Sequence, residues 1–254
     1  MSLHSMFDGI VRTYDSLNRI LTGGLDEVWR KNCAKECVSG RVIVDLCCGT
    51  GELALLISKH VTSDTCVLGL DFSKAMLGRA MNKNHVASQK RTSHRQDKLQ
   101  TAHSINLILA DAAHLPFKDD GIDRIGIAFS FRNLVYRNPK TKMFLKETMR
   151  SLRPGGKFVC TETSQPKGRL LRIFYHLYLN IVVSYVGGFI SRHRGAYRYL
   201  GTSAINFPPA EEITNMLSST GFQDVVFKHM SLGAVAIHMG VKAIPINNPS
   251  SDSL

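Results

Sequence analysis

The chain has six cysteines but no paired Cys-x-x-Cys framework, and its eight prolines and twenty glycines follow no period. The cysteine spacing favours reduced thiols of a cytosolic protein over a disulfide scaffold. The glycine and proline content excludes fibrous and collagen-like classes. The N-terminus lacks a basic stretch followed by an apolar one, so no signal peptide is expected.

Three patterns that would indicate other chemistries are also missing. There is no GxxxxGK[ST] phosphate loop, which disfavours kinase and GTPase activity. There is no HExxH motif and no cluster of cysteine and histidine, so no metal is implied. Leu53-Ala54 stands where a third glycine would complete a dinucleotide-binding GxGxxG, and that class therefore fits poorly.

The composition is that of one globular domain. Of 254 residues, 44% are hydrophobic and 20% charged, which allows a sizeable core. Thirty-two basic residues against twenty acidic ones give a net charge of +12. Such a charge suits an anionic partner, either nucleic acid or the cytoplasmic leaflet of a membrane, and does not choose between them.

Strand-like and helix-like segments alternate along the chain, which predicts an α/β fold with a mostly parallel sheet. Ser73 is expected to cap a helix that begins at Lys74. Strands are expected at 42–46, 66–71, 105–111, 124–130, 157–161, 225–227 and 235–241. Helices are expected before residue 41, at 52–60, from residue 74, and at 139–152 and 210–219.

We expect a single domain over residues 1–242, followed by a flexible tail at 243–254. Residues 1–40 form an N-terminal helical cap. Residues 84–104 are polar, basic and almost aperiodic, which predicts a flexible surface insertion, although a nucleic-acid or lipid-headgroup patch is an alternative. Residues 167–207 form a lid or substrate segment.

An apolar stretch at residues 169–190 is about long enough to span a bilayer. It carries Arg172, His176 and Asn180, which are costly at the centre of a membrane. An apolar helix of a soluble or peripheral protein is therefore favoured.

A glycine-containing turn after the first strand carries the clearest chemical signal. Gly49 and Gly51 allow the backbone to approach a ligand closely, and the helix that follows presents free N–H groups. Asp71 and Asp111 end the next two strands. Because ligands of open α/β sheets bind at the carboxyl ends of strands, these acids suit ribose hydroxyls and an adenine amino group.

With these motifs the chain resembles S-adenosylmethionine-dependent methyltransferases of the Rossmann-like class I. More closely, it resembles the ubiquinone/menaquinone biosynthesis C-methyltransferase family of the UbiE/MenG type. The resemblance runs from Met6 to Lys242 and rests on MFD at 6–8, YDSLN at 14–18, DLCCGTGEL at 45–53, LDFSKAML at 70–77, FRN at 131–133, LRPGGKF at 152–158, ETSQP at 162–166, YRYL at 197–200 and GAVAIHMGVK at 233–242. The chain departs from the family pattern at Leu17, Thr22 and Asp26, where Met, Ser and His are usual.

The resemblance implies a mostly parallel seven-stranded sheet with helices on both faces, a helical lid insertion and S-adenosylmethionine as cofactor. In that arrangement Asp45 would brace the glycine loop and Asp71 would hold the ribose. Asp111 and the backbone of Ala112 would read the adenine. The full cofactor site it implies is Asp45, Gly49, Thr50, Gly51, Asp71, Asp111 and Ala112.

The implied reaction is methylation of a ring carbon on a polyprenylated quinol, with demethylmenaquinol to menaquinol favoured. Loss of a phenolic proton pushes electron density onto that carbon, which attacks the sulfonium methyl group in line. Arg132 would stabilise the phenolate or orient a water, unless it forms only a surface ion pair. Glu162 would accept a proton or merely brace Arg132.

For the substrate, we predict contacts from Asn133, Tyr197 and Tyr199, although aromatic residues at such spacing are often packing residues. The apolar stretch then suits a lid over the prenyl tail, docked on the membrane with Arg169 and Arg172 at the headgroups, or alternatively a buried helix.

Alternatives of other classes stay open. They are a methyltransferase acting on RNA or another lipid, and a non-catalytic cofactor-binding subunit of a quinone-synthesis complex. Against nucleic acid, FPPA at 207–210 is not an Asn/Asp-Pro-Pro-aromatic motif. We expect a polyprenylated quinol and the membrane surface as partners, no nucleic acid, no metal, and a cytoplasmic location that includes the inner face of the membrane. A homodimer is left open.

Overall fold

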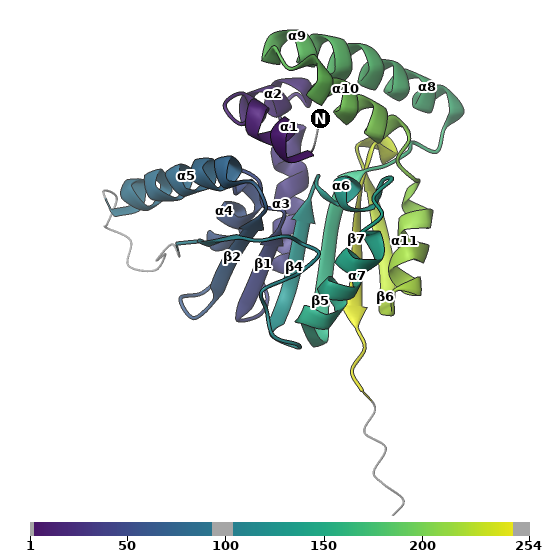
Figure 1. Ribbon diagram of the computed structural model, residues 1–254. Helices are drawn as coiled ribbons and strands as arrows, with labels where there is room; N and C mark the ends of the chain where they lie inside the picture. Colours follow the sequence, from purple (N-terminus) through teal and green to yellow (C-terminus); the bar gives the residue numbers. More distant parts are fainter. Residues whose placement is uncertain (1–2, 93–103, 246–254) are drawn as a thin grey trace, which may run out of the picture.

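A single sheet of seven strands forms the centre of the protein (Figure 1). The computed structural model describes residues 3–92 and 104–245. The strand order is β3-β2-β1-β4-β5-β7-β6. Within the described residues, β7 runs in the opposite direction to the other six strands. The strands are β1 (Val42–Leu46), β2 (Cys66–Asp71), β3 (Asn106–Leu109), β4 (Ile122–Ala128), β5 (Leu152–Thr163), β6 (Phe222–Met230) and β7 (Val235–Lys242). The expected seven-stranded, mostly parallel sheet is confirmed.

Helices cover both faces of this sheet because its central strands are apolar on both sides. Ile43 and Val44, adjacent in β1, are both fully buried but belong to different core clusters. The Ile43 cluster includes residues of α3 (Leu25–Cys37) and α4 (Glu52–Ser58). The Val44 cluster includes residues of α6 (Phe131–Val135), α7 (Thr141–Ser151) and α11 (Ala210–Ser219).

The structure differs from the expected elements in two regions. The strand expected at 124–130 is β4, which ends at Ala128, and it is followed by the short helix α6, which was not predicted. The flexible insertion predicted from residue 84 was wrong at its start, since α5 (Lys74–Thr92) continues through that region. The Asn84 side chain pairs with the backbone of Ile105, with an Nδ2–O distance of 3.1 Å, which fixes this part of the helix against the start of β3. The remainder of the insertion, at 93–103, and tail residues 246–254 lie outside the described residues.

The N-terminal helices form a cap over the carboxyl ends of the strands. They are α1 (Leu3–Ile10), α2 (Tyr14–Leu21) and the start of α3. Figure 1 shows α1 and α2 beside the helices of the C-terminal half, above the sheet. Phe7 and Leu17 of this cap share one buried cluster with Met76 of α5 and with Tyr197. Residues distant in sequence therefore enclose the space above β1 and β4.

The lid is a helical hairpin with one long arm and one returning arm. It consists of α8 (Arg169–Tyr178), the π-helix η1 (Leu179–Val186), α9 (Gly187–Ser191) and the returning α10 (Arg194–Ile205). Close approach of the two arms requires a glycine in α10. A Cβ added at Gly201 would lie 2.7 Å from the carbonyl oxygen of Leu179 and would overlap the Ser184 hydroxyl. The lid is therefore held at a spacing that a larger residue would break.

A Gly201→Ala substitution is expected to lower the free energy of unfolding by about 1–3 kcal/mol, because α10 must move away from η1. Gly195→Ala is the matched control, since it lies on the same helix with no atom within 4 Å of the added carbon. Urea denaturation monitored by circular dichroism measures both. Equal stability of the two variants would contradict the described packing of the lid.

Candidate functional site

The turn after β1 combines strained and open backbone positions. Cys47, Gly49 and Gly51 have φ angles of 55°, 53° and 79°, in the left-handed region. A Cβ at Gly51 would lie 3.0 Å from that of Ala80 in α5, whereas one at Gly49 would meet nothing within 4 Å. Gly51 thus permits close helix packing, and the peptide at Gly49 lies open to the adjacent cavity.

Asp45 supports this turn through a hydrogen bond to the helix that follows it. Its Oδ2 accepts the backbone N–H of Ala54 at 2.9 Å, and the residue is almost fully buried. Burial raises the pKa of Asp45 to about 8, opposed in part by the Ala54 hydrogen bond. It does not line the cavities described below, which suits the supporting role expected for it.

Asp71, at the end of β2, connects two loops. Its Oδ2 accepts the N–H of Gly49 at 2.8 Å and its Oδ1 accepts that of Ser73 at 2.9 Å. Burial raises the pKa of this carboxyl group. Because each carboxylate oxygen has two lone pairs, both remain able to accept a further hydrogen bond.

A cavity of about 590 Å³, here called the loop cavity, opens between the glycine turn and α6. Asp71 and Asp111 lie on its wall, and the Asp111 carboxylate pairs with Lys140 at 3.1 Å. The backbone N–H of Ala113 also donates to Asp111, at 2.9 Å. The remaining wall is largely apolar, and the full lining is Phe7, Tyr14, Cys47, Gly49, Asp71, Phe72, Met76, Asp111, Ala112, Ser130, Asn133, Leu134, Asn138, Pro139, Lys140 and Phe144.

The features of the loop cavity fit S-adenosylmethionine. An exposed glycine peptide allows close approach, Asp71 can accept from two adjacent hydroxyls, and Ala112 lies in an apolar slot beside Asp111. Two carboxylates, those of Asp71 and Asp111, line the cavity and would favour a ligand that carries a positive sulfonium.

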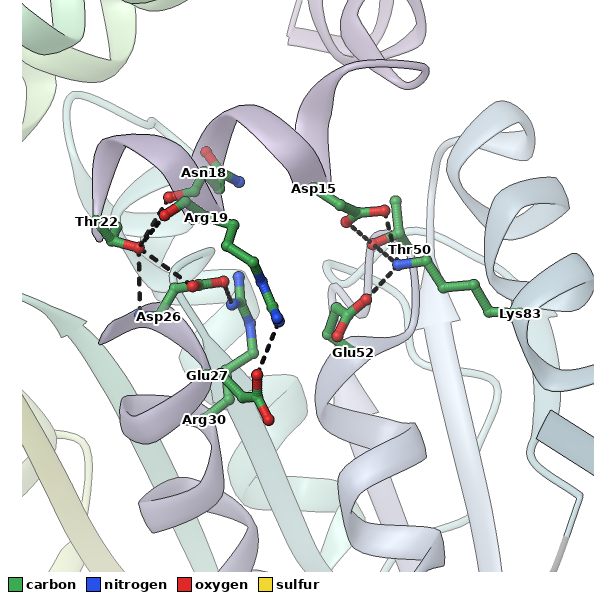
Figure 2. A network of polar contacts seen from close by, with 10 residues as sticks. All are labelled: Asp15, Asn18, Arg19, Thr22, Asp26, Glu27, Arg30, Thr50, Glu52 and Lys83. Atoms are coloured by element: carbon green, nitrogen blue, oxygen red, sulfur yellow. Dashed lines mark hydrogen bonds and ion pairs between the residues drawn. The ribbon is translucent and has the colours of Figure 1, made fainter. Parts of the chain in front are cut away.

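Thr50 has a different environment from the one expected. Its hydroxyl donates to Asp15 of α2 at 2.6 Å and does not line the loop cavity. Lys83 of α5 approaches the same group, with Nζ 3.0 Å from Thr50 Oγ1 and 2.7 Å from Asp15, and it also pairs with Glu52 (Figure 2). This network connects the N-terminal cap to the glycine turn, so that the two are held together.

A second cavity of about 150 Å³, here called the lid cavity, lies beneath α8 and η1. Tyr14 lines both cavities, so it stands between them. Burial raises the pKa of the Tyr14 hydroxyl, while the nearby Arg30 lowers it. The lining is Tyr14, Asn18, Leu21, Thr22, Asp26, Trp29, Arg30, Phe129, Arg132, Thr163, Tyr175, Tyr178, Leu179, Val183, Leu200, Ala204, Ala234 and Val235.

Arg132 and Glu162 form a buried pair at the base of the lid cavity. Arg132 Nη1 donates to Glu162 Oε1 at 3.1 Å and to Thr163 Oγ1 at 2.8 Å, and the Arg132 backbone N–H donates to Glu162 Oε2 at 3.0 Å. Glu162 is 1% exposed and also accepts from the backbone N–H and the hydroxyl of Thr163. Arg132 reaches the cavity and Glu162 does not. The geometry therefore supports Glu162 as the brace of Arg132 rather than as a proton acceptor.

The three predicted substrate residues divide between different surfaces. Asn133 lines the loop cavity, and its Oδ1 accepts from the Tyr199 hydroxyl at 3.2 Å. Tyr199 and Asn133 also line an open groove beside that cavity. Tyr197 lines neither the loop cavity nor the lid cavity, and its side chain is fully buried in the cluster that joins cap and lid. Two residues apart on α10, the two tyrosines point to different sides of the helix.

Sequence reasoning missed several residues of the lid cavity. Tyr14 was part of a family motif but had no role assigned, and Phe129 lies just beyond β4 with an unusual φ of 59°. Asp26 and Arg30, four residues apart on α3, also face the cavity. The one signal that could have found the last two is their spacing, which places an acid and a base on the same face of a helix.

The chain is similar to known proteins over almost its whole length. The model of the ubiE/COQ5 methyltransferase family matches residues 1–242. A ubiquinone/menaquinone biosynthesis C-methyltransferase UbiE of Geobacter sulfurreducens is 34% identical over 245 residues, 95% of this chain and 89% of the relative. A demethylmenaquinone methyltransferase of Staphylococcus aureus is 34% identical over 242 residues, 94% of this chain and 92% of the relative.

Solved structures of low sequence identity share the fold. A SAM-dependent methyltransferase from Aquifex aeolicus is 15% identical with a TM-score of 0.56, over 89% of this chain and 97% of that one. Phosphoethanolamine N-methyltransferase 2 of Haemonchus contortus, solved with S-adenosyl-L-methionine, is 16% identical with a TM-score of 0.53, over 81% of this chain and 49% of that one. The expected class I methyltransferase fold is thereby confirmed.

The buried Asp45 predicts a pH dependence of stability. Its pKa of about 8 lies above the value of about 3.9 for an unfolded aspartate, so between these pH values the native state holds a proton that the unfolded state has released. Stability contributed by this group is therefore full below about pH 4 and falls as the pH rises towards 8. Asp45→Asn is expected to flatten this decline in the cofactor-free protein.

Urea unfolding at several pH values from 5 to 9 measures the effect, roughly the pH window in which the group titrates. The exposed Asp224→Asn is the matched control. If wild type and Asp45→Asn lose stability in parallel as the pH rises, Asp45 is not protonated in the native state.

Proposed function

The chain belongs to the ubiE/COQ5 methyltransferase family, and from this premise we propose that it methylates a ring carbon of demethylmenaquinol to give menaquinol. The family resemblance, the S-adenosylmethionine-dependent C-methyltransferase activity and the role in menaquinone/ubiquinone biosynthesis expected from the sequence are confirmed by the comparisons. The choice of a naphthoquinol over a benzoquinol is part of the proposal, and the Staphylococcus aureus relative supports it.

One structural observation carries the assignment of the site. A cavity whose wall carries the carboxylates of Asp71 and Asp111 and a second cavity that contains Arg132 meet at Tyr14. This arrangement suits a charged cofactor on one side and an aromatic ring with a hydrophobic tail on the other.

The loop cavity would hold S-adenosylmethionine through Asp71, Asp111 and the peptide at Gly49. When bound, the cofactor supplies an electrophilic methyl group on a sulfonium. Asp45 keeps the glycine turn in shape from outside the cavity, and Thr50 connects it to the cap. The Lys83 network closes the cap over the cofactor and limits access of water.

The lid cavity would hold the quinol ring beside Arg132. A phenol has a pKa near 10, so a fixed cation that stabilises its anion makes the ring carbon a better nucleophile at neutral pH. Arg132 is held by Glu162 and Thr163 and needs no rearrangement to meet that negative charge. Guanidinium is a poor proton acceptor, so the proton would leave to a water that Arg132 orients.

Residues of the lid suit the prenyl tail. Leu179 and Val183 of η1, together with Leu200 and Ala204 of α10, form apolar wall of the lid cavity. A tail leaving the ring would lie along this wall, on the inner side of the lid. Its continuation would reach the outer, apolar surface of α8 and η1.

That outer surface supports docking on a membrane. Arg169–Ser191 is long and apolar enough to cross a membrane by length and composition, yet only 17% of its apolar window is buried. The side chains left exposed are Leu170, Ile173, Phe174, Leu177, Ile181, Tyr185, Val186, Phe189 and Ile190. Because η1 packs on α10, we place the segment flat on the inner face of the membrane, with the protein body in the cytoplasm.

Methyl transfer from labelled S-adenosylmethionine tests the activity. The purified protein is offered reduced demethylmenaquinone and a demethylated polyprenyl benzoquinol in parallel, and we expect label on the naphthoquinol. Asp71→Ala is expected to abolish labelling by weakening cofactor binding. Label on the benzoquinol alone would reverse the choice of substrate, and label on neither would overturn the proposed function in favour of RNA or another lipid.

Arg132→Lys tests the phenolate site in the same assay. Lysine keeps the charge but cannot reproduce the planar fork that contacts both Glu162 and Thr163, so kcat is expected to fall about 10²–10³-fold. Calorimetry should show cofactor affinity within a few-fold of wild type. An unchanged kcat would remove Arg132 from the reaction.

Membrane docking predicts a loss of vesicle binding when Phe174 and Phe189 are both replaced by serine. Each is largely exposed, so the partition coefficient on vesicles of phosphatidylglycerol and phosphatidylcholine is expected to fall more than about tenfold. Val226→Ser, at an exposed apolar position on β6, is the control. Co-sedimentation measures all three proteins, and equal binding would contradict docking through the lid.

A further inference from the structure

An acid and a base on α3 form a second charged pair in the lid cavity, besides the pair that includes Arg132. Asp26 Oδ2 accepts a hydrogen bond from Arg30 Nη1, and both side chains are about nine-tenths buried. Both lie on the cavity wall. Nothing in the proposed chemistry at Arg132 uses them.

The pair is fixed from several directions. The Thr22 hydroxyl lies 3.1 Å from Asp26 Oδ1 and accepts the Asp26 backbone N–H at 3.3 Å (Figure 2). The Arg30 guanidinium lies over the Phe129 ring, 5.3 Å from its centroid. A buried ion pair on a cavity wall is costly unless it is well satisfied, and the two contacts of the Asp26 carboxylate leave further lone pairs on its oxygens.

The position of this pair relative to Arg132 follows from Phe129. Phe129 contacts Arg30 and precedes Arg132 by three residues at the end of β4. Both arginines line the lid cavity together with Tyr14. The lid cavity, about 150 Å³ in volume, therefore presents charged groups at two places, Arg132 and the Asp26–Arg30 pair, besides neutral polar side chains such as Asn18 and Thr22.

A 1,4-quinol matches these two places, because it carries hydroxyl groups on opposite sides of the ring. Only one of them is next to the carbon that receives the methyl group, and the proposed function assigns that one to Arg132. We propose that the Asp26 carboxylate, held by Arg30 and Thr22, accepts a hydrogen bond from the second hydroxyl and so selects ring substrates that are reduced at that position. This inference rests on the proposed function and names a specificity-determining residue for it.

A carboxylate at this position favours the reduced ring over the oxidised ring. An ionised aspartate only accepts hydrogen bonds, so it pairs with the O–H of a quinol and not with the carbonyl oxygen of a quinone. A ring with hydrogen at that position would leave the buried acceptor without its partner, and such mismatches discriminate strongly.

The test compares two substrates and three variants in the full-length protein. The substrates are short-chain demethylmenaquinol and the corresponding prenylated 1-naphthol, which keeps the hydroxyl beside the reacting carbon and has hydrogen in place of the second one. The variants are Asp26→Asn, Asp26→Glu and the matched control Glu27→Gln, a charge-to-amide change at the next position of α3, where Glu27 pairs with the surface residues Arg19 and Lys31.

We expect Asp26→Asn to lower kcat/KM for the quinol at least about tenfold and for the naphthol no more than about twofold. For each substrate, kcat/KM of the variant is divided by kcat/KM of the wild type. The different intrinsic reactivities of the two rings therefore cancel. Asp26→Glu keeps the charged carboxylate acceptor, which the neutral amide oxygen of asparagine does not replace, and is expected to retain most of the preference. Glu27→Gln should leave both values unchanged.

Equal losses on both substrates would overturn the inference, because they would mean that Asp26 only supports Arg30 and the cavity wall. The same holds if wild type methylates the quinol and Asp26→Asn methylates it equally well. Wild type that labels neither substrate would instead overturn the proposed function, and the inference with it, so the two failures are distinguishable.

Discussion

The arrangement of the site depends on the hydrogen bonds that the carboxylate of Glu162 accepts near the end of the interior strand β5. This carboxylate accepts hydrogen bonds from the backbone and side chain of Arg132 and from Thr163. These contacts fix the start of α6 and the direction of the guanidinium together. Because a buried charge without its partner costs several kcal/mol, the pair cannot separate without disturbing α6 and the cavity wall above it.

The site above Glu162 is assembled from several elements, none of which forms it alone. Strands β1 and β2 supply the glycine turn and Asp71, the N-terminal cap supplies Tyr14, and the lid supplies the apolar wall. The Lys83 network connects the cap to the turn, and Tyr14 separates the two cavities. Under the proposed function, a methyl donor in the loop cavity and an acceptor ring in the lid cavity would meet at Tyr14.

The sequence was informative where function depends on local patterns. The β-branched run of β1, the glycines at 49 and 51 and the acid that ends β2 each predict their structure, because strand burial and left-handed turns restrict residue type. The lid cavity could not be predicted, since its wall combines residues from 14 to 235. The buried position of Tyr197 could not be predicted for the same reason. The side of α10 that faces the cavity depends on how the lid folds back, and that depends on the close packing of Gly201 on η1.

The cluster that joins the cap to the lid also constrains how the chain can fold. It brings Met6 and Phe7 against Ala196 and Tyr197, which closes a loop of about 190 residues. On the ribosome, the cap helices therefore emerge long before their packing partners have been synthesised. Until the lid has left the exit tunnel, the apolar faces of the cap helices are exposed or covered only transiently. The sheet can begin to form earlier, but an enclosed site requires nearly the whole chain, so a truncated product would contain the glycine turn without a closed chamber for methyl transfer.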